Sequence, residues 1–420
     1  MKITVLAAGS RGDIQPYLAF SVGLQKAGYQ VCLAANSNFS ALAKQYDIPF
    51  FPLQIDSYAF TQDPRARAWL ESRNPLKLAF ESVRIIQPMV AQLLKDAWVA
   101  AQDADAIVYH SYAMPTGYYI GKQLGIPTLP ISMYPLPTRA HRALPIELLF
   151  PMGGWGNLAS HWIVDYFTWQ VYRPSAQKLF RGQQRVRRTT PYQALYREKR
   201  PLICCYSPSA FPKPDDVPDH VNVLGYFFLD PPSDWQPSAE LSQFLAAGPP
   251  PVYVGFGSMG DPAKADETTE MVLAALAKTG QRGLLASGWS GLGKEKAMPD
   301  NVFVLDGAPH TWLMPQMAAN IHHGGVGTTG AALRAGVPNA VVPHFGDQPF
   351  WGEQVAKLGV GPGPIHRKQL TVDKLAKMVE TAVSNPTMRH RAATLGQQIQ
   401  TEDGIAQSIK LFEQYLANSQ

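Results

Sequence analysis

The segments His322-His-Gly-Gly-Val-Gly-Thr-Thr-Gly330 and Pro343-His-Phe-Gly-Asp-Gln348 contain the strongest structural signal in this chain. The apolar run at 319–321 predicts a buried strand, and the glycines behind it let the backbone turn tightly and approach a ligand. Thr328 and Thr329 predict the start of a helix that ends at Gly336. A strand, a glycine turn and a helix in this order are typical of an α/β domain.

The same turn is suited to binding phosphate. A helix N-terminus presents free N–H groups and the positive end of the helix dipole, which together attract anions. His322 and His323 stand at its entrance and can add donors, but adjacent strand residues point to opposite faces and make poor joint metal ligands. Asp347 and Gln348 then offer groups that bind sugar hydroxyls. A phosphate site close to a site for sugar hydroxyls suggests that the chain binds a nucleotide-sugar. The alternative is a glycine turn with a purely structural role.

Composition narrows the class of protein. A chain of 420 residues favours two domains, and its 46% hydrophobic content supports large cores. The net charge of +5 comes without a dense Lys/Arg block interleaved with aromatics, which argues against a nucleic-acid partner. Cys32, Cys204 and Cys205 are too few for a disulfide framework, so we expect a reducing cytoplasm. We find no apolar run suited to a secretory leader or a spanning helix.

Short apolar runs alternate with amphipathic stretches along both halves of the chain, which predicts parallel sheets with helices on both faces. The predicted strands are 3–7, 31–34, 106–109, 128–131, 252–254, 283–286, 302–305, 320–321 and 340–342. The predicted helices are 16–27, 267–278, a helix capped by Thr371 that ends at 383, and 405–416. We therefore expect two doubly wound, Rossmann-like sheets facing across a cleft, with ligands at the carboxyl ends of the strands.

A proline-rich stretch divides the chain. Seven prolines between 207 and 237 mark a linker region. The N-terminal domain then spans 1–206 and the C-terminal domain spans 238–400. The last segment, 401–420, is predicted to be a helix that packs back on the N-terminal domain.

Gly255-Phe-Gly257-Ser-Met-Gly260 matches the dinucleotide fingerprint G-x-G-x-x-G, but its context does not. The fingerprint requires a helix at once and an acidic residue after the second strand. Here Asp261-Pro262 intervenes, and the next strand ends at Ala286 without an Asp or Glu. The remaining interpretation is a close approach of the backbone, with Ser258 available to bind phosphate.

A second loop, Gly9-Ser-Arg-Gly-Asp13, is predicted between the first strand and the first helix. It displays Asp13 beside a helix N-terminus. Asp13 is either a general base facing the other domain or a simple capping residue.

Five motifs resemble one known family. They are Gly-Ser-Arg-Gly-Asp at 9–13, Val-Gly-Phe-Gly-Ser at 254–258, Ala-Pro-His-Thr-Trp-Leu at 308–313, His-His-Gly-Gly-Val-Gly-Thr-Thr at 322–329 and Gly-Asp-Gln-Pro at 346–349. In this order they make the whole chain similar to inverting GT-B glycosyltransferases of family one, in the branch of the sterol and glycopeptide-antibiotic enzymes. The resemblance implies a hexosyltransferase that uses a UDP-sugar, UDP-glucose above all, as donor substrate without a cofactor or a metal.

The resemblance also implies roles for these residues. The N-terminal domain would bind the acceptor, with Ser10, Arg11 and Gly12 as the acceptor loop and Asp13 as the base. The donor phosphates would be bound by Ser258, His323, Gly325, Gly327, Thr328 and Thr329, the nucleoside by Ala308 and His310, and the sugar by Asp347 and Gln348. Plant members carry Trp where Gly307 stands, so stacking on the base must come from elsewhere or be absent.

Catalysis on this scheme needs a base and a stabilised leaving group. Asp13 takes the proton of the attacking hydroxyl, while the helix dipole, His323 and amide donors stabilise the departing diphosphate. Attack opposite the leaving group inverts the anomeric centre. His110, after strand 106–109, is a second catalytic candidate that orients Asp13 or shares its proton; the alternative is a buried histidine outside the chemistry.

The acceptor class is inferred from an aromatic segment at 145–181 and the basic residues at 181–188. Its aromatic residues are Phe150, Trp155, Trp162, Tyr166, Phe167, Trp169 and Tyr172. Such a segment forms core, an apolar pocket or a membrane-facing patch. We expect a lipophilic acceptor such as a sterol, another terpenoid or a lipid alcohol, in a cytoplasmic protein for which peripheral membrane contact stays open.

Alternative functions were weighed on the same residues. A nucleotide-sugar epimerase of this fold would need acid–base carboxylates deep in the sugar site and no acceptor pocket. A non-catalytic binding protein would be expected to lack Asp13 or Asp347, and an oxidoreductase would need the missing ribose-binding acid. A dTDP-sugar-dependent natural-product glycosyltransferase stays open, because recognition of one methyl group cannot be inferred from this sequence.

Overall fold

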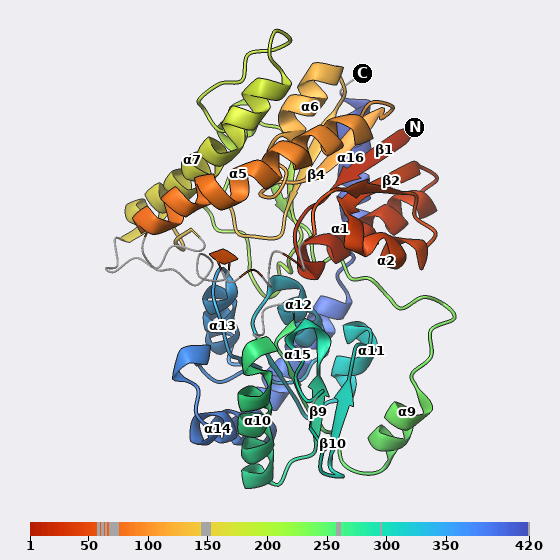
Figure 1. The fold of residues 1–420 in the computed structure, drawn as a ribbon, viewed down its shortest axis with the longest axis vertical. Coiled ribbons are helices and arrows are strands. Elements are labelled where there is room, and N and C mark those ends of the chain that lie inside the picture. Colours follow the sequence, from red (N-terminus) through yellow and green to blue (C-terminus); the bar gives the residue numbers. More distant parts are fainter. Residues whose placement is uncertain are drawn as a thin grey trace. The chain divides into compact units, whose positions relative to one another are not determined.

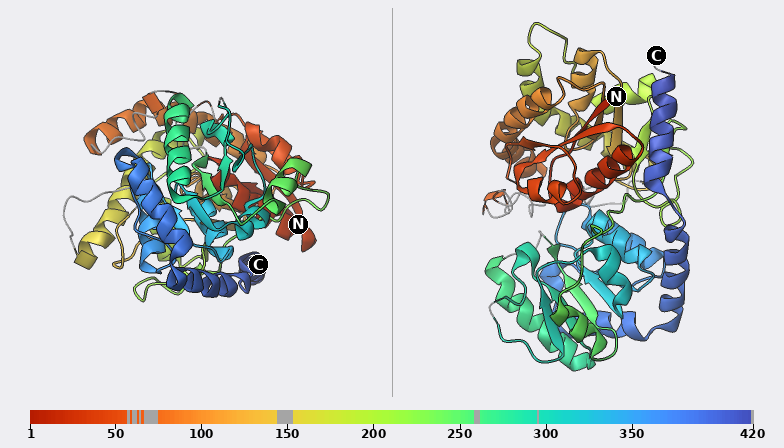
Figure 2. Two further views of the ribbon diagram at one scale, coloured as in Figure 1. Left: turned by 90° about the horizontal axis from the view of Figure 1, so that it is seen from below. Right: turned by 90° about the vertical axis from the view of Figure 1, so that its right-hand side faces the viewer.

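The chain forms two compact units, each built on its own sheet (Figures 1 and 2). A computed structural model describes residues 1–56, 59, 63, 65–66, 75–143, 153–257, 262–294 and 296–418. The first unit comprises Met1–Phe227 and Glu402–Gln420, and the second comprises Phe228–Thr401. The proline-rich stretch 207–237 is thus divided between the two units.

The first unit contains a parallel sheet with the strand order β3-β2-β1-β4-β5-β6-β7. The strands are β1 (Lys2–Leu6), β2 (Gln30–Asn36), β3 (Phe50–Leu53), β4 (Ala106–His110), β5 (Thr128–Ser132), β6 (Leu202–Cys204) and β7 (Val221–Val223). Strand β1 pairs with β2 on one side and with β4 on the other, so the strand order reverses between β1 and β4. Ligands of doubly wound sheets bind at such a reversal, here beside Leu6 and His110.

Helices cover both faces of this sheet (Figure 1). They are α1 (Arg11–Lys26), α2 (Ser40–Lys44), α5 (Pro75–Ala100), α6 (Gly117–Leu124), α7 (Gly153–Leu179), α8 (Pro191–Glu198) and α16 (Gly404–Ala417). Helices α5 and α7 pack together, as do α1 and α16. The core between α5, α7 and the sheet includes buried Leu94, Trp169 and Phe180, and burying each such side chain contributes about 1.5–3 kcal/mol.

Helix α1 corrects one prediction. The helix expected at 16–27 begins at Arg11, so Arg11, Gly12 and Asp13 form its first turn rather than a loop. Proline favours the first helical position and so predicts a start at Pro16, but Pro16 lies inside the helix. Ser10 is the N-cap, and the Asp13 carboxylate at the third helical position accepts a hydrogen bond from the Ser10 N–H, as in a capping box.

The second unit contains a parallel sheet with the strand order β10-β9-β8-β11-β12. The strands are β8 (Val252–Gly255), β9 (Gly283–Ala286), β10 (Val302–Leu305), β11 (Ala319–His322) and β12 (Asn339–Val341). The helices are α9 (Ala239–Ala246), α10 (Ala265–Thr279), α11 (His310–Leu313), α12 (Val326–Arg334), α13 (Gln348–Lys357), α14 (Val372–Ser384) and α15 (Pro386–Gln400). Strand order reverses between β8 and β11, which pair with His322 opposite Gly255. The turns after these two residues therefore meet at one edge.

Most predicted elements of this unit are confirmed. Strands β9 and β10 have the predicted bounds, and Thr371 caps α14 by accepting a hydrogen bond from the Lys374 N–H at 3.3 Å. Helix α12 begins at Val326, two residues before the predicted start, because Gly325 rather than a threonine is its N-cap.

Contacts at the start of α16 add to its packing against α1. The Ser207 hydroxyl donates to Glu402 at 2.7 Å, just before the helix. Gly225 and Gly404 lie so close that a Cβ on Gly225 would be 3.2 Å from the Gly404 backbone. Across the part of the chain that the structure describes, no helix is both long and apolar enough to cross a membrane.

Candidate functional site

Asp13 lies in the first turn of α1, just after the carboxyl end of β1. Its Oδ2 accepts hydrogen bonds from the Ser10 N–H at 2.7 Å and from the Ser10 hydroxyl at 2.8 Å. Its Oδ1 accepts one from the Tyr134 hydroxyl at 3.2 Å. The side chain remains partly exposed. A carboxylate that is held in one orientation and still reaches solvent is suited to act as a general base.

Gly9 makes room for this carboxylate. It has φ of 138°, and a Cβ at this position would lie 2.4 Å from Asp13 Oδ2. Its N–H donates to the side-chain oxygen of buried Asn36 at 3.1 Å. The end of β2 therefore anchors the turn that carries Asp13.

His110 ends β4 and is only 2% exposed. Neither ring nitrogen has a hydrogen-bond partner among the described residues, so no hydrogen bond joins the ring to Asp13. Burial lowers the pKa of His110, although the charge of Asp13 and the nearby Ala8 backbone act in the opposite direction. The structure thus places an uncharged His110 near Asp13, and its assistance to the base stays a prediction.

Tyr134 is a partner of Asp13 that the sequence analysis missed. It follows β5, and its ring lies 6.4 Å from His110 and 5.5 Å from Tyr112 between centroids. Tyr112 in turn lies 5.4 Å from Tyr192. These rings form a continuous aromatic wall leading away from Asp13. No spacing rule links residues 121 positions apart, so no sequence signal indicated this contact.

The aromatic residues proposed for the acceptor divide between two faces of α7. Trp169 and Tyr172 are buried at 1% and 9% exposure, as core residues. Trp155, Tyr166 and Phe167 are exposed at 73%, 47% and 55%. Phe150 lies outside the described residues, and Trp162 packs edge-on against Tyr196 at 5.9 Å.

The buried face of α7 also carries an acid. Asp165 is 2% exposed, and its Oδ2 has no hydrogen-bond partner in the described structure. Burial raises the pKa of Asp165 to about 8. The side chain is therefore protonated at neutral pH.

His323 begins the donor turn of the second unit, between two glycine backbones. A Cβ on Gly257 would lie 3.0 Å from His323 Cε1, and a Cβ on Gly325 would lie 2.6 Å from His323 Nε2. The ring is therefore held by close approach of the turns that follow β8 and β11. Burial lowers the pKa of His323 to about 4, so it would meet a donor as a neutral hydrogen-bonding ring.

His322 has a structural role, as expected for one of the adjacent pair. It is completely buried, and its Nδ1 accepts a hydrogen bond from the Gly324 N–H at 3.1 Å. Burial, with the charges of His323 and His310, lowers the pKa of His322 to about 3. The side chain thus holds the turn in shape from inside.

The N-terminus of α12 follows this turn. Its N-cap is Gly325, and no side chain caps the first turn. The first N–H groups of the helix therefore remain available to an anion. Thr328 is partly exposed beside them, whereas Thr329 is fully buried and its N–H bonds to the Gly325 carbonyl at 2.8 Å. Of the predicted cradle, Gly325, Gly327 and Thr328 reach the surface and Thr329 does not.

Asp347 and Gln348 stand at the start of α13, against the donor turn. A Cβ on Gly324 would lie 2.9 Å from the Gln348 carbonyl oxygen. Asp347 Oδ2 accepts a hydrogen bond from the buried Trp351 indole at 2.7 Å. Gln348 is 3% exposed, and its Oε1 accepts from the His344 N–H at 2.8 Å. The carboxylate of Asp347 is thus fixed at the site, while Gln348 mainly shapes the loop before it.

The predicted nucleoside residues lie at the end of β10. Ala308 is partly exposed, and His310 Nε2 lies 3.3 Å from the Tyr253 hydroxyl. Gly307 is exposed, and a Cβ there would meet nothing within 4 Å. The position where plant members carry Trp is therefore exposed and has no side chain to stack on a base.

Two predictions about the donor site, the role of Ser258 and the lack of a metal, are not tested by the structure. Ser258 lies outside the described residues. Among the residues that are described, no three His, Cys, Asp or Glu side chains are grouped as metal ligands.

Two protein families match this chain. Residues 3–129 match the glycosyltransferase family 28 N-terminal domain. Residues 271–408 match the C-terminal domain described as erythromycin biosynthesis protein CIII-like. Each match falls mainly within one structural unit.

Several plant and fungal enzymes are similar over nearly the whole chain. The sterol 3-beta-glucosyltransferases UGT80A2 and UGT80B1 of Arabidopsis thaliana are each 33% identical, over 100% and 99% of this chain and 66% and 68% of their own length. The sterol 3-beta-glucosyltransferase of Aspergillus fumigatus is 34% identical over 98% of this chain and 29% of its own length. The chain thus spans about two thirds of these plant relatives and less than a third of the fungal one.

Several solved glycosyltransferases have the same fold as this chain. The calicheamicin glycosyltransferase CalG4 has a TM-score of 0.68 at 19% identity, over 99% of this chain and 98% of its own. The glycosyltransferase VinC, solved in complex with dTDP, has a TM-score of 0.66 at 17% identity over 100% of both chains. These matches confirm the predicted GT-B fold. With the relatives above, they show that this chain belongs to the glycosyltransferase family that includes the sterol 3-beta-glucosyltransferases.

Proposed function

We propose that this protein transfers glucose from UDP-glucose to the hydroxyl of a lipophilic acceptor of the sterol class. The observation that supports it most is the Asp13 carboxylate, oriented on both oxygens by Ser10 and Tyr134 and still open to solvent. The printed names of the relatives, sterol 3-beta-glucosyltransferases, support the acceptor and the sugar.

The acceptor half of the reaction takes place at Asp13. The acceptor hydroxyl gives its proton to Asp13 as its oxygen forms a bond to the anomeric carbon of the donor. The Ser10 and Tyr134 donors keep the carboxylate aimed while the proton transfers. His110 supplies an uncharged wall beside the base.

The donor half uses the second unit. As the new bond forms, the bond from the anomeric carbon to the diphosphate breaks, and both electrons leave with UDP. The α12 amides and the neutral His323 ring donate hydrogen bonds to the growing negative charge. Asp347, held by Trp351, accepts hydrogen bonds from the sugar hydroxyls. Attack from the face opposite the diphosphate turns an α-linked donor into a β-glycoside.

A dTDP-sugar is the second candidate donor. VinC, a protein of the same fold, was solved with dTDP, and exposed Gly307 has no side chain that would distinguish thymine from uracil. We therefore keep both nucleotides in the test.

The experiment is a transfer assay with the purified protein. UDP-glucose and dTDP-glucose are each incubated with a sterol, a terpenoid alcohol, a flavonoid and a water-soluble alcohol, and nucleotide release is followed together with the mass of the products. We expect a hexose-shifted sterol from UDP-glucose. Asp13→Asn keeps the size of the side chain but removes the base, so it should abolish product while UDP binding persists.

The control is Asp103→Asn, which removes an exposed carboxylate with 83% side-chain exposure elsewhere in the first unit. It should leave turnover unchanged. Product from water-soluble acceptors alone would overturn the acceptor class, and faster turnover of dTDP-glucose would overturn the donor. A sugar converted to its epimer without any acceptor would establish the epimerase instead.

A further inference from the structure

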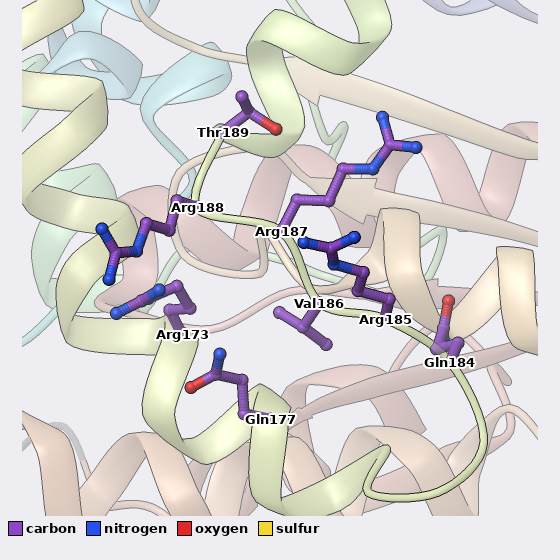
Figure 3. Close-up of a pocket in the computed structure, with 8 residues that line it drawn as sticks. All are labelled: Arg173, Gln177, Gln184, Arg185, Val186, Arg187, Arg188 and Thr189. Carbon is purple, nitrogen blue, oxygen red and sulfur yellow. The ribbon is translucent and has the colours of Figure 1, made fainter.

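A cavity lined by arginines lies in the first unit, away from Asp13 and His110. It has a volume of about 750 Å³, and Figure 3 shows its lining. Arg173 and Gln177 come from α7, and Gln184, Arg185, Arg187 and Arg188 come from the segment that follows it. No acidic side chain lines the cavity, so four positive charges surround it.

The segment 184–189 is held firmly in place. Gln184 Nε2 donates to the Tyr119 carbonyl at 2.7 Å, and the Arg187 N–H donates to the Tyr119 hydroxyl at 3.2 Å. The Trp169 indole donates to the Arg187 carbonyl at 3.1 Å. Val186 is buried at 8% exposure between its exposed arginine neighbours. The arginines therefore project from a backbone that the core fixes.

The four arginines lack an anionic partner within the part of the chain that the structure describes. Among the described residues, no carboxylate forms an ion pair with any of the four guanidinium groups. Arg173 Nε and Gln184 Oε1 are buried without a hydrogen-bond partner. Figure 3 shows the guanidinium groups of Arg173 and Arg188 extending the same way from their two elements. Neighbouring arginines of this kind are suited to phosphate groups, which guanidinium groups bind through paired hydrogen bonds.

An apolar stripe on α7 continues from this cavity. At about 100° per residue, Tyr166, Arg173 and Gln177 lie within about 40° of Trp155 around the helix axis. Ile163 and Phe167, exposed at 49% and 55%, lie about 80° and about 120° from Trp155, so the apolar stripe is broad. Large exposed apolar side chains next to a basic cluster are the pattern of a surface that lies on an anionic membrane.

We propose that α7 and the arginine cavity form a membrane-docking surface, in which the arginines bind lipid phosphates and the apolar stripe enters the interface. This surface would hold the protein where a lipophilic acceptor is dissolved. The proposal concerns binding to the lipid and does not require that the acceptor or the donor be the ones named above.

The test measures binding of the full chain to vesicles, without donor or acceptor. One set is phosphatidylcholine, and the other is an equal mixture of phosphatidylcholine and phosphatidylglycerol. We expect preferential, salt-sensitive binding to the anionic set. Arg185→Gln with Arg188→Gln changes two exposed side chains and should weaken that binding about thirtyfold, at about fivefold per cation. Phe167→Ser should weaken binding to both sets.

The control is Lys26→Gln with Lys44→Gln, which removes the same charge from exposed sites outside the cavity. The logarithm of its vesicle affinity should fall by less than a third of the fall caused by the two arginine substitutions. Equal losses would reduce the effect to net charge and overturn the proposal. A different result would assign the cavity to a soluble phosphate and overturn the proposal. In that case the protein would not bind vesicles, inorganic pyrophosphate would raise its thermal stability, and the Arg185→Gln, Arg188→Gln variant would lose this stabilisation. Transfer to a detergent-dispersed sterol, measured in parallel, reports on the enzyme separately.

Discussion

Replacing Gly9 with alanine should displace the base without removing it. An added Cβ would lie 2.4 Å from Asp13 Oδ2, where ordinary contact begins at 3.4 Å, so the carboxylate must move by about 1.0 Å (3.4 − 2.4). That movement would break the bonds of Oδ2 to the Ser10 N–H and hydroxyl at 2.7 and 2.8 Å. A misplacement of about 1 Å can cost about a hundredfold in rate.

The substitution also strains the backbone. Gly9 has φ of 138°, and a side chain in such a region costs on the order of 1–3 kcal/mol of folding free energy. Gly28→Ala separates the two effects. Gly28 lies just past the other end of the same helix with φ of 90°, and a Cβ there would meet nothing within 4 Å. It therefore has the backbone strain without the collision.

The assay is kcat/KM for glucosyl transfer, with UDP affinity and urea unfolding measured on the same preparations. We expect both variants to lose stability and only Gly9→Ala to lose about a hundredfold in kcat/KM. UDP affinity should hold in both, because the donor groups belong to the second unit. If Gly9→Ala keeps activity within about threefold of Gly28→Ala, Asp13 does not need this position and the proposed base is wrong.

Three further results are expected. Tyr134→Phe removes one hydrogen-bond donor to Asp13. A partly exposed hydrogen bond is worth about 1 kcal/mol, so kcat should fall about fivefold while UDP affinity stays unchanged. An unchanged kcat would show that Ser10 alone orients the base. His322 has a pKa of about 3 when folded and an ordinary value of 6.5, so stability present above pH 6.5 is lost as the pH falls towards 3. His322→Asn, which can keep an acceptor for Gly324, should reduce that acid slope in urea unfolding, and an equal slope would contradict the burial argument. Asp165 has a pKa raised to about 8, so stability is lost as the pH rises from about 4 through 8, and Asp165→Asn should unfold at a higher urea concentration than the parent at pH 8.

The donor turn shows how far local sequence reaches. The strand at 319–321, the glycine turn and the helix after it were predicted, and the structure has all three within two residues at the helix start. All the information lies within about fifteen neighbouring residues, since glycine conformations and helix N-termini are local preferences. Burial is not local, so the prediction gave Thr329 and Thr328 equal roles, whereas only Thr328 reaches solvent.

The base site shows the opposite case. Asp13 was singled out, but its predicted loop is the first turn of α1, because the capping bond between Asp13 and Ser10 starts the helix five residues before Pro16. The sequence offered His110 either as an assistant of Asp13 or as a buried histidine outside the chemistry, and it did not indicate that the Tyr134 hydroxyl donates to Asp13. The order of strands brings β1, β4 and β5 side by side, and only this pairing places residues 13 and 134 together.

The sequence by itself determined the alternation of strands and helices, the two glycine turns and the residue types offered to a donor. These depend on hydrophobic periodicity and backbone preference, which act over a few residues. Tertiary structure decided which groups meet: Tyr134 with Asp13, Gly257 with His323, and the arginine segment 184–189 with Tyr119. Such contacts join residues far apart in the chain, and they arise only when burial of both faces of a sheet selects one strand order and one packing of its helices.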